Sequence, residues 1–192
     1  MTQTPTRRTG RRQFLLIAVV FLGPLAVAAW LYFQGGMLQP TGRTNHGALL
    51  EPIVNLNAAL PEAAIHAHND QTWLLLYANT AGCGDPCREA LYTSRQSRLM
   101  LGREMDRVQR IFLRGESAPD TVFMAEEHQD LIALEDSSLD DLLTNKRPAD
   151  LAPGGLFLID PLGNLVMYFP PGLDPSEMVD DIKRLLKLSR IG

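Results

Sequence analysis

A run of twenty residues without a charged side chain, Phe14 to Phe33, most constrains what this 192-residue chain can fold into. A helix of that length spans about 30 Å, the thickness of the hydrocarbon core of a bilayer. Pro24 lies inside the run, and a membrane helix tolerates proline better than a soluble helix does. Trp30 and Tyr32 stand near its end, where interfacial aromatic residues gather. The run therefore predicts a single transmembrane helix over residues 14–33.

The charges that flank this run predict its orientation. Residues 1–13 form a basic segment with four arginines, whereas only Arg43 follows the run closely. The positive-inside rule then places the N-terminus in the cytoplasm and the rest of the chain outside it. As an alternative, Arg11-Arg12 resembles a twin-arginine export signal, and Ala26-Val27-Ala28 resembles a cleavage site. The apolar run continues to Phe33, beyond that site, which favours an uncleaved anchor.

A short linker, residues 34–44 with three glycines and a proline, separates the anchor from a predicted folded domain over residues 45–192. This domain carries 13 basic against 22 acidic residues, a formal net charge of −9. That balance argues against a nucleic acid partner and is typical of a soluble acidic surface. The chain also contains no Gly-rich phosphate loop, no HExxH helix and no nucleophile elbow. Kinase and hydrolase functions are therefore unsupported.

Hydrophobic patterning predicts strands and helices in the order βαβ and then ββα. Residues 71–79 hold an apolar run, Trp73 to Tyr77, that is typical of a strand buried on both faces. Residues 45–70 have no clear pattern. The other predicted elements are a helix from about Pro86 to Gly102, a strand at 108–113, a helix within 120–130, a strand at 131–134, hairpin strands at 156–159 and 165–169, and a helix begun by Asp174-Pro175-Ser176-Glu177.

The only two cysteines, Cys83 and Cys87, lie in the segment TAGCGDPCREAL that follows the first buried strand. Asp85-Pro86 is a helix-start pattern, which predicts that Asp85 caps the helix, that Cys87 lies in its first turn and that Cys83 lies just outside. The helix N-terminus favours the thiolate, the form that exchanges disulfides and binds metals, although the Asp85 charge partly opposes it. A structural disulfide, a redox pair and a metal site remain open. A purely structural disulfide is disfavoured, because a bond between Cys83 and Cys87 closes a very small loop and constrains the unfolded chain little.

This element order resembles the thioredoxin fold, and three residues rather than two separate the cysteines. An exported membrane protein with that spacing resembles the SCO/SenC family of cytochrome c oxidase assembly proteins. Residues 157–163, FLIDPLG, match a strand and turn of that family. Asn45-His46-Gly47, Leu50, Pro52 and residues 95–98, RQSR, are similar to SCO-like membrane proteins associated with bacterial oxidases. The resemblance covers residues 45–190 and implies an α/β fold: a thioredoxin-like three-layer α/β/α domain behind one transmembrane helix.

The resemblance also implies a function and a location. Cys83 and Cys87 would be both the catalytic and the metal-binding residues of a protein that delivers copper to the oxidase, reduces the thiols of its copper centre, or does both. The implied partners are the lipid bilayer, an oxidase subunit and a periplasmic thiol reductant, with the chain in the bacterial inner membrane and the domain in the periplasm. A general periplasmic thiol-disulfide oxidoreductase and a non-catalytic membrane-tethered binding module are the alternatives.

One departure from the family limits the copper hypothesis. Copper-binding members use a histidine shortly before the FLIDP strand, and residues 150–154 contain none. Two thiolates without an imidazole favour Cu(I) over Cu(II). Other nitrogen or soft sulfur donors could replace this histidine as a ligand, but none has a diagnostic spacing. We expect His46 to lie in a loop, and the methionines Met100 and Met105 to lie in the core. We expect solvent exposure for the remaining histidines, His66, His68 and His128.

Pro153 lies in this same segment and has two interpretations. In thioredoxin-like oxidoreductases a cis-proline stands beside the cysteines just before this strand. Alternatively, Pro153 is an ordinary loop proline in a Pro-Gly-Gly turn.

Overall fold

The computed structural model describes residues 7–33, 45–115 and 121–189. The chain divides into two compact units, residues 1–44 and 45–192. The first contains α1 (Arg7–Phe33), in which Gly10–Trp30 is long and apolar enough to cross a membrane. The described apolar side chains of this helix are exposed, as they would be in contact with lipid.

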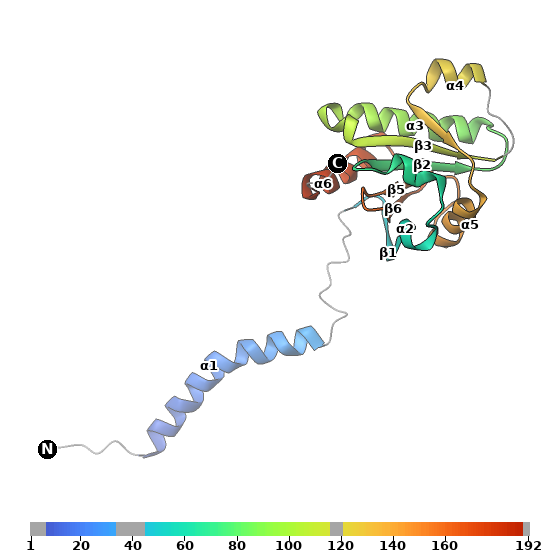
Figure 1. Cartoon of the computed structure of the whole chain (residues 1–192). Helices are drawn as coiled ribbons and strands as arrows, with labels where there is room; N and C mark the ends of the chain where they lie inside the picture. Colours follow the sequence, from blue (N-terminus) through green and yellow to red (C-terminus); the bar gives the residue numbers. More distant parts are fainter. Residues whose placement is uncertain (1–6, 34–44, 116–120, 190–192) are drawn as a thin grey trace. The chain divides into compact units, whose positions relative to one another are not determined.

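A six-stranded mixed sheet forms the centre of the second unit, in the order β1-β6-β5-β2-β3-β4 (Figure 1). The three strands on one side, β2, β3 and β4, are parallel, and the remaining neighbours pair antiparallel. The strands are β1 (Ala48–Asn55), β2 (Trp73–Asn79), β3 (Val108–Arg114), β4 (Leu131–Leu134), β5 (Leu156–Ile159) and β6 (Asn164–Phe169). The helices are α2 (Leu56–Ala59), α3 (Asp85–Met100), α4 (Thr121–Glu127), α5 (Ser137–Lys146) and α6 (Pro175–Leu188), with 3-10 helices η1 (Ala64–His68) and η2 (Gly102–Arg107).

Side chains along each strand point alternately to the two faces of the sheet, so one part of the hydrophobic core lies on each face. In β2, Trp73, Leu75 and Tyr77 join the cluster that includes residues of α3 and α6, whereas Leu74 and Leu76 join the cluster that includes residues of α5. Every residue from Trp73 to Tyr77 is buried, as the continuous apolar run predicts. The sheet is therefore the middle layer of an α/β/α domain of the thioredoxin type, and the predicted fold class is confirmed.

The predicted strands and the C-terminal helix agree closely with the structure. β4 and β5 have the predicted bounds, and Asp174 caps α6 by accepting a hydrogen bond from the Ser176 N–H at 2.7 Å. Five elements had no prediction: β1, α2, η1, η2 and α5. Strand β1 includes Pro52 and lies at the sheet edge, where a residue without a ladder donor is tolerated.

Candidate functional site

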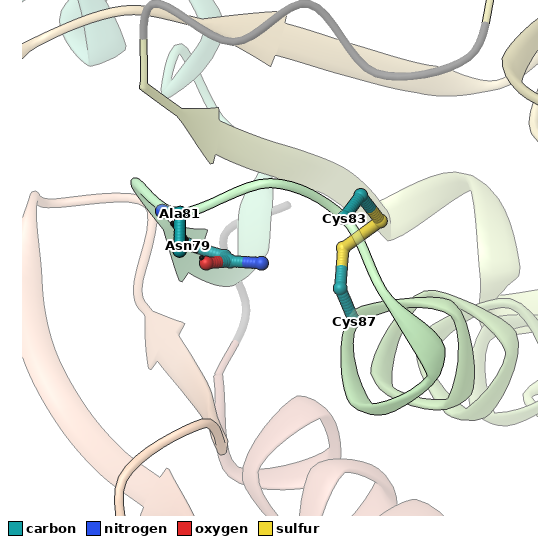
Figure 2. The surroundings of a disulfide bond; sticks show 4 residues. All are labelled: Asn79, Ala81, Cys83 and Cys87. Carbon is teal, nitrogen blue, oxygen red and sulfur yellow. Dashed lines mark hydrogen bonds between the residues drawn. A yellow bond between two sulfur atoms is a disulfide. The ribbon is translucent and has the colours of Figure 1, made fainter.

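The loop between β2 and α3 holds Cys83 and Cys87, and the structure joins them in a disulfide with a Cα–Cα distance of 5.1 Å (Figure 2). Asn79, at the end of β2, shapes the start of this loop, since its Oδ1 accepts a hydrogen bond from the Ala81 N–H at 3.0 Å. Further on, the Gly84 N–H donates to the Gly82 carbonyl at 3.0 Å. These local hydrogen bonds help to place Cys83 just before α3 and Cys87 in its first turn.

The helix begins one residue earlier than predicted. Gly84 is the N-cap, and its carbonyl accepts the Arg88 N–H at 3.0 Å, which closes the first turn. Asp85 is consequently inside the helix, and no side chain caps its N-terminus, so the predicted capping role of Asp85 is wrong. The Asp85 carboxylate instead lies in the first turn, where it interacts favourably with the helix dipole.

The two sulfur-bearing residues differ in exposure. Cys87 is 2% exposed and belongs to the core cluster on the α3 face, whereas Cys83 is half-buried at its margin. This difference is the one expected for a residue within the first turn and a residue just before it. Cys83 is therefore the sulfur that a reactant in solution can approach more easily.

A pocket of about 100 Å³ lies beside the start of α3, and its lining includes Pro86, the residue before Cys87, but neither cysteine. One wall is the first half of α3, including Pro86 next to Cys87, and the other walls are the segment before β5 and the segment between β6 and α6. Most of its lining is apolar, with Glu89 as the only ionisable side chain. The lining residues are Pro86, Glu89, Ala90, Thr93, Pro153 to Leu156, Pro170 to Leu173 and Met178.

Tyr168 holds one wall of this pocket. Its buried hydroxyl donates to the Ala152 carbonyl and accepts the Gly155 N–H at 2.9 Å. A side chain at Gly155 would place Cβ 2.0 Å from the Phe169 carbonyl oxygen, so only glycine fits. Burial raises the pKa of Tyr168, which keeps its hydroxyl available as a donor.

Pro153 lies on this wall in a trans peptide bond, since Glu51-Pro52 is the one cis bond in the described residues. The structure therefore supports the loop-proline interpretation. Pro153 is exposed and lines the same pocket as Pro86, and its trans bond shows that the cis-proline interpretation is wrong.

The four histidines occupy different environments. His46 precedes β1 as expected; its backbone N–H donates to Asp181 at 2.7 Å, and its Nδ1 lies 3.4 Å from a carboxylate oxygen of Glu177. His66 and His68 lie on the 3-10 helix η1, and both are half-buried rather than exposed to solvent as we expected.

His128 differs most from expectation, because it is 3% exposed rather than solvated. Its Nδ1 lies 3.1 Å from Arg110 Nη2, and Arg110 is fully buried on β3. Burial first, and then the Arg110 charge, lowers the pKa of His128 to about 4. The charged residues Glu126, Glu127 and Asp130 around it in the sequence concealed the fact that the chain turns inward after α4.

The Arg95–Arg98 segment is connected to this same region. Arg95 pairs with Glu127 at 2.7 Å, and Arg98 donates to the Val108 carbonyl at 2.7 Å. Ser97 is fully buried. These residues therefore join α3 to β3 and to the end of α4, which is a structural contribution to the fold.

The described residues contain no cluster of three His, Cys, Asp or Glu side chains that could hold a metal ion. Neither predicted methionine supplies an obvious ligand: Met105 is partly buried against the α3-face core, and Met100 is 44% exposed, so its predicted core position is wrong. The two cysteine sulfurs are bonded to each other, and the core cluster that contains Cys87 also includes Met167 and Met178.

Comparison with known proteins agrees with this architecture. Residues 73–189 match the family model described as transmembrane-like, thioredoxin-like, C-terminal domain, and residues 4–35 match the transmembrane-like, N-terminal domain. No curated protein matches the chain significantly.

Solved structures with the same fold include SCO proteins. ScoI of Arabidopsis thaliana with copper bound is 18% identical, with a TM-score of 0.52 over 65% of this chain and 89% of that one. Yeast Sco1 with copper bound is 17% identical, with a TM-score of 0.51 over 65% of this chain and 81% of that one. The chain belongs to the transmembrane-like, thioredoxin-like family, and its second unit has the SCO-like thioredoxin fold behind a single-pass membrane anchor.

Proposed function

We propose that this protein is a membrane-anchored thiol-disulfide exchange protein that acts through Cys83 and Cys87. The observation that carries the proposal is the asymmetric disulfide at a helix N-terminus, with Cys87 buried, Cys83 half-buried, and Pro86 between them lining an apolar pocket. A disulfide of purely structural value would not need an accessible sulfur or such a pocket, and it would close too small a loop to stabilise the fold greatly.

The reaction follows from this asymmetry. In the reduced protein the Cys83 thiolate attacks a client disulfide, forms a mixed disulfide and releases one client sulfur as a thiolate. The Cys87 thiolate then attacks the Cys83 sulfur, which releases the second client thiolate and leaves the Cys83–Cys87 disulfide. Two electrons pass to the client, and a dithiol reductant of the same compartment must return them. The N-terminus of α3 stabilises each thiolate.

The pocket beside Pro86 supplies a binding surface for the client. Its apolar walls suit an extended, uncharged polypeptide segment on one side of the target cysteine. Tyr168 and Gly155 hold the far wall in a single conformation, so little conformational freedom would be lost on binding.

A Cu(I) carrier is the second candidate, because solved SCO structures with this fold contain copper. Cys83 and Cys87 supply two soft sulfur ligands, which suit Cu(I) in low coordination. Since no group of three His, Cys, Asp or Glu side chains lies together in the described residues, this donor set is a poor match for Cu(II), whose tetragonal preference calls for nitrogen or oxygen donors.

The similarity in fold to SCO proteins and the membrane anchor together support a cellular role for the protein. In this role it assists cytochrome c oxidase biogenesis from the bacterial inner membrane. The four arginines before the uncharged run Phe14 to Phe33 support a cytoplasmic N-terminus and a periplasmic domain. Alkaline phosphatase joined after Gly192 should then be active, whereas an inactive fusion beside an active control reporter would contradict this topology.

Kinetics with two oxidants test the role of the pocket in exchange. Thr93→Tyr narrows the pocket from its rim on α3, so reduction of a peptide disulfide should slow about tenfold, a loss of about 1.4 kcal/mol of binding. Reduction of glutathione disulfide, which is too small to need the pocket, should stay within about twofold. Gln96→Tyr, also on α3 but outside the pocket, is the control. Equal slowing with both oxidants would contradict the pocket's role.

A further inference from the structure

A second pocket, of about 430 Å³, lies where η2 meets the C-terminal half of α6. It shares no residue with the pocket lined by Pro86. Its lining consists of two buried leucines, four cations and one acid: Leu101, Leu186, Arg103, Arg107, Lys183, Lys187 and Glu104.

Internal contacts already satisfy one cation and the acid of this basic pocket. Arg107 Nη1 donates to Glu104 at 2.8 Å and to the Leu186 carbonyl at 3.2 Å, and Nη2 donates to the Ser189 carbonyl at 3.1 Å. These three acceptors hold the Arg107 guanidinium against the C-terminal end of α6, and the charge of Arg107 neutralises that of Glu104. The remaining cations of the pocket then have no internal counter-charge from Glu104.

The other three cations, Arg103, Lys183 and Lys187, line the same pocket. In the part of the chain that the structure describes, no recorded ion pair involves Arg103, Lys183 or Lys187. Lys183 and Lys187 are also one turn apart on α6, where like charges repel. The second unit as a whole is acidic, with 13 basic against 22 acidic residues, yet four of those cations surround this one pocket.

We propose that the basic pocket binds a phosphoryl group. Separate ammonium and guanidinium donors match the several oxygens of one phosphoryl anion. The buried Leu101 and Leu186 add an apolar floor, which suits the carbon skeleton beside a phosphodiester. Two sources carry this chemistry: the headgroup of an anionic phospholipid and free phosphate.

The folded unit is joined to the membrane helix by a short linker, so phospholipid headgroups are always within its reach. Residues 34–44 connect the membrane helix to the folded unit and reach at most about 40 Å when fully extended. A basic face on an otherwise acidic unit is attracted to an anionic bilayer within a Debye length of about 8 Å at physiological salt. Binding there would orient the unit on the membrane.

Hydrogen exchange of the full chain in nanodiscs tests the site and its source. Amides of residues 102–107 and 183–188 should exchange more slowly in discs with about 30% phosphatidylglycerol than in phosphatidylcholine discs, and high salt should abolish the difference. The variant Lys183→Gln, Lys187→Gln should weaken docking about 25-fold, about fivefold per lysine, and so lose the protection. Glutamine suits an exposed helix, and circular dichroism would verify the fold.

Lys146→Gln, an exposed charge on α5, is the matched control and should retain the protection. Protection of the same segments in phosphatidylcholine discs by added inorganic phosphate, with no further effect of phosphatidylglycerol, would support the site and assign free phosphate as its source. Unchanged exchange under every condition, or protection that persists in the double lysine variant, would overturn the proposal.

Discussion

Arg110 Nη2 and His128 Nδ1 lie 3.1 Å apart in a buried network, and this contact fixes the state of the imidazole. Arginine only donates, so Nδ1 must accept and the proton of the neutral ring must be on Nε2. Other N–H groups of the same guanidinium donate to Ser94, to the Leu91 carbonyl and to Asp130. A single buried arginine thereby connects α3 to the end of α4.

Removal of this imidazole should destabilise the protein. His128→Ala leaves one Arg110 N–H without its acceptor in a buried site, and such a loss costs about 1–3 kcal/mol. Urea unfolding of the full chain in detergent, followed by circular dichroism, would measure it. His68→Ala on η1 is the control and should cost less than about 1 kcal/mol, because His68 is only half-buried. Equal losses in the two variants would contradict the network's role.

The same contact predicts the pH dependence of stability. The folded pKa of His128 is about 4, below its ordinary value of 6.5, so the unfolded chain binds this proton more readily. Stability from the neutral ring is therefore complete above pH 6.5 and is lost as the pH falls toward 4, by at most about 1.4 kcal/mol per pH unit. Urea midpoints between pH 7 and pH 4.5 should fall more steeply for the native chain than for His128→Asn. Parallel curves would show that His128 does not titrate in this way.

Tyr168 offers a test of the pocket wall. Tyr168→Phe removes the acceptor of the Gly155 N–H and the donor to the Ala152 carbonyl, so we expect a loss of about 1–3 kcal/mol together with slower reduction of peptide disulfides. Tyr92→Phe is the matched control, since Tyr92 is exposed on α3. If Tyr168→Phe leaves both stability and peptide reduction at the level of the control, the hydroxyl does not hold the wall.

The sequence predicted the parts of this structure that depend on local patterns. Strand β2 reads as a continuous apolar run, and the order of Cys83 and Cys87 around a helix start follows from Asp85-Pro86. The cap itself was misplaced by one residue, because Gly84 closes the turn through its backbone and offers no side-chain signal. Helix α5 was missed, although Asp136 caps it by accepting the Leu139 N–H at 3.0 Å, since its apolar positions are few.

Features that depend on long-range contacts had no local signal. His128 stands among charged residues in the sequence, and only its meeting with Arg110, eighteen residues earlier, makes it a buried acceptor. Likewise, the role of Tyr168 depends on Gly155 across a loop and a strand. A buried arginine in the middle of a predicted strand was the one available hint that a polar network would be needed there.

Metal binding should follow the chemistry of two sulfurs. The reduced full chain, titrated under anaerobic conditions, should bind one Cu(I) and should bind Cu(II) only weakly. Binding of either ion should be lost in the double variant Cys83→Ser, Cys87→Ser. Tight stoichiometric Cu(II) binding with a thiolate charge-transfer band would reveal a third ligand. Replacement of His46, His66, His68 and His128 in turn would identify it. No binding of either ion would remove the Cu(I) candidate and leave thiol exchange unaffected.

Trapping of the mixed disulfide tests the central proposal most directly. A chain with Cys87→Ser keeps the accessible sulfur but cannot resolve the intermediate, so incubation of the reduced protein with a peptide disulfide should accumulate a covalent adduct at Cys83, visible by non-reducing mass spectrometry. In Cys83→Ser the buried Cys87 should form at least about tenfold less adduct, because its sulfur is shielded. The native chain should instead show the Cys83–Cys87 disulfide and two free thiols on the peptide. Adducts that form equally at both cysteines, or a native chain that fails to reduce the peptide, would contradict the account.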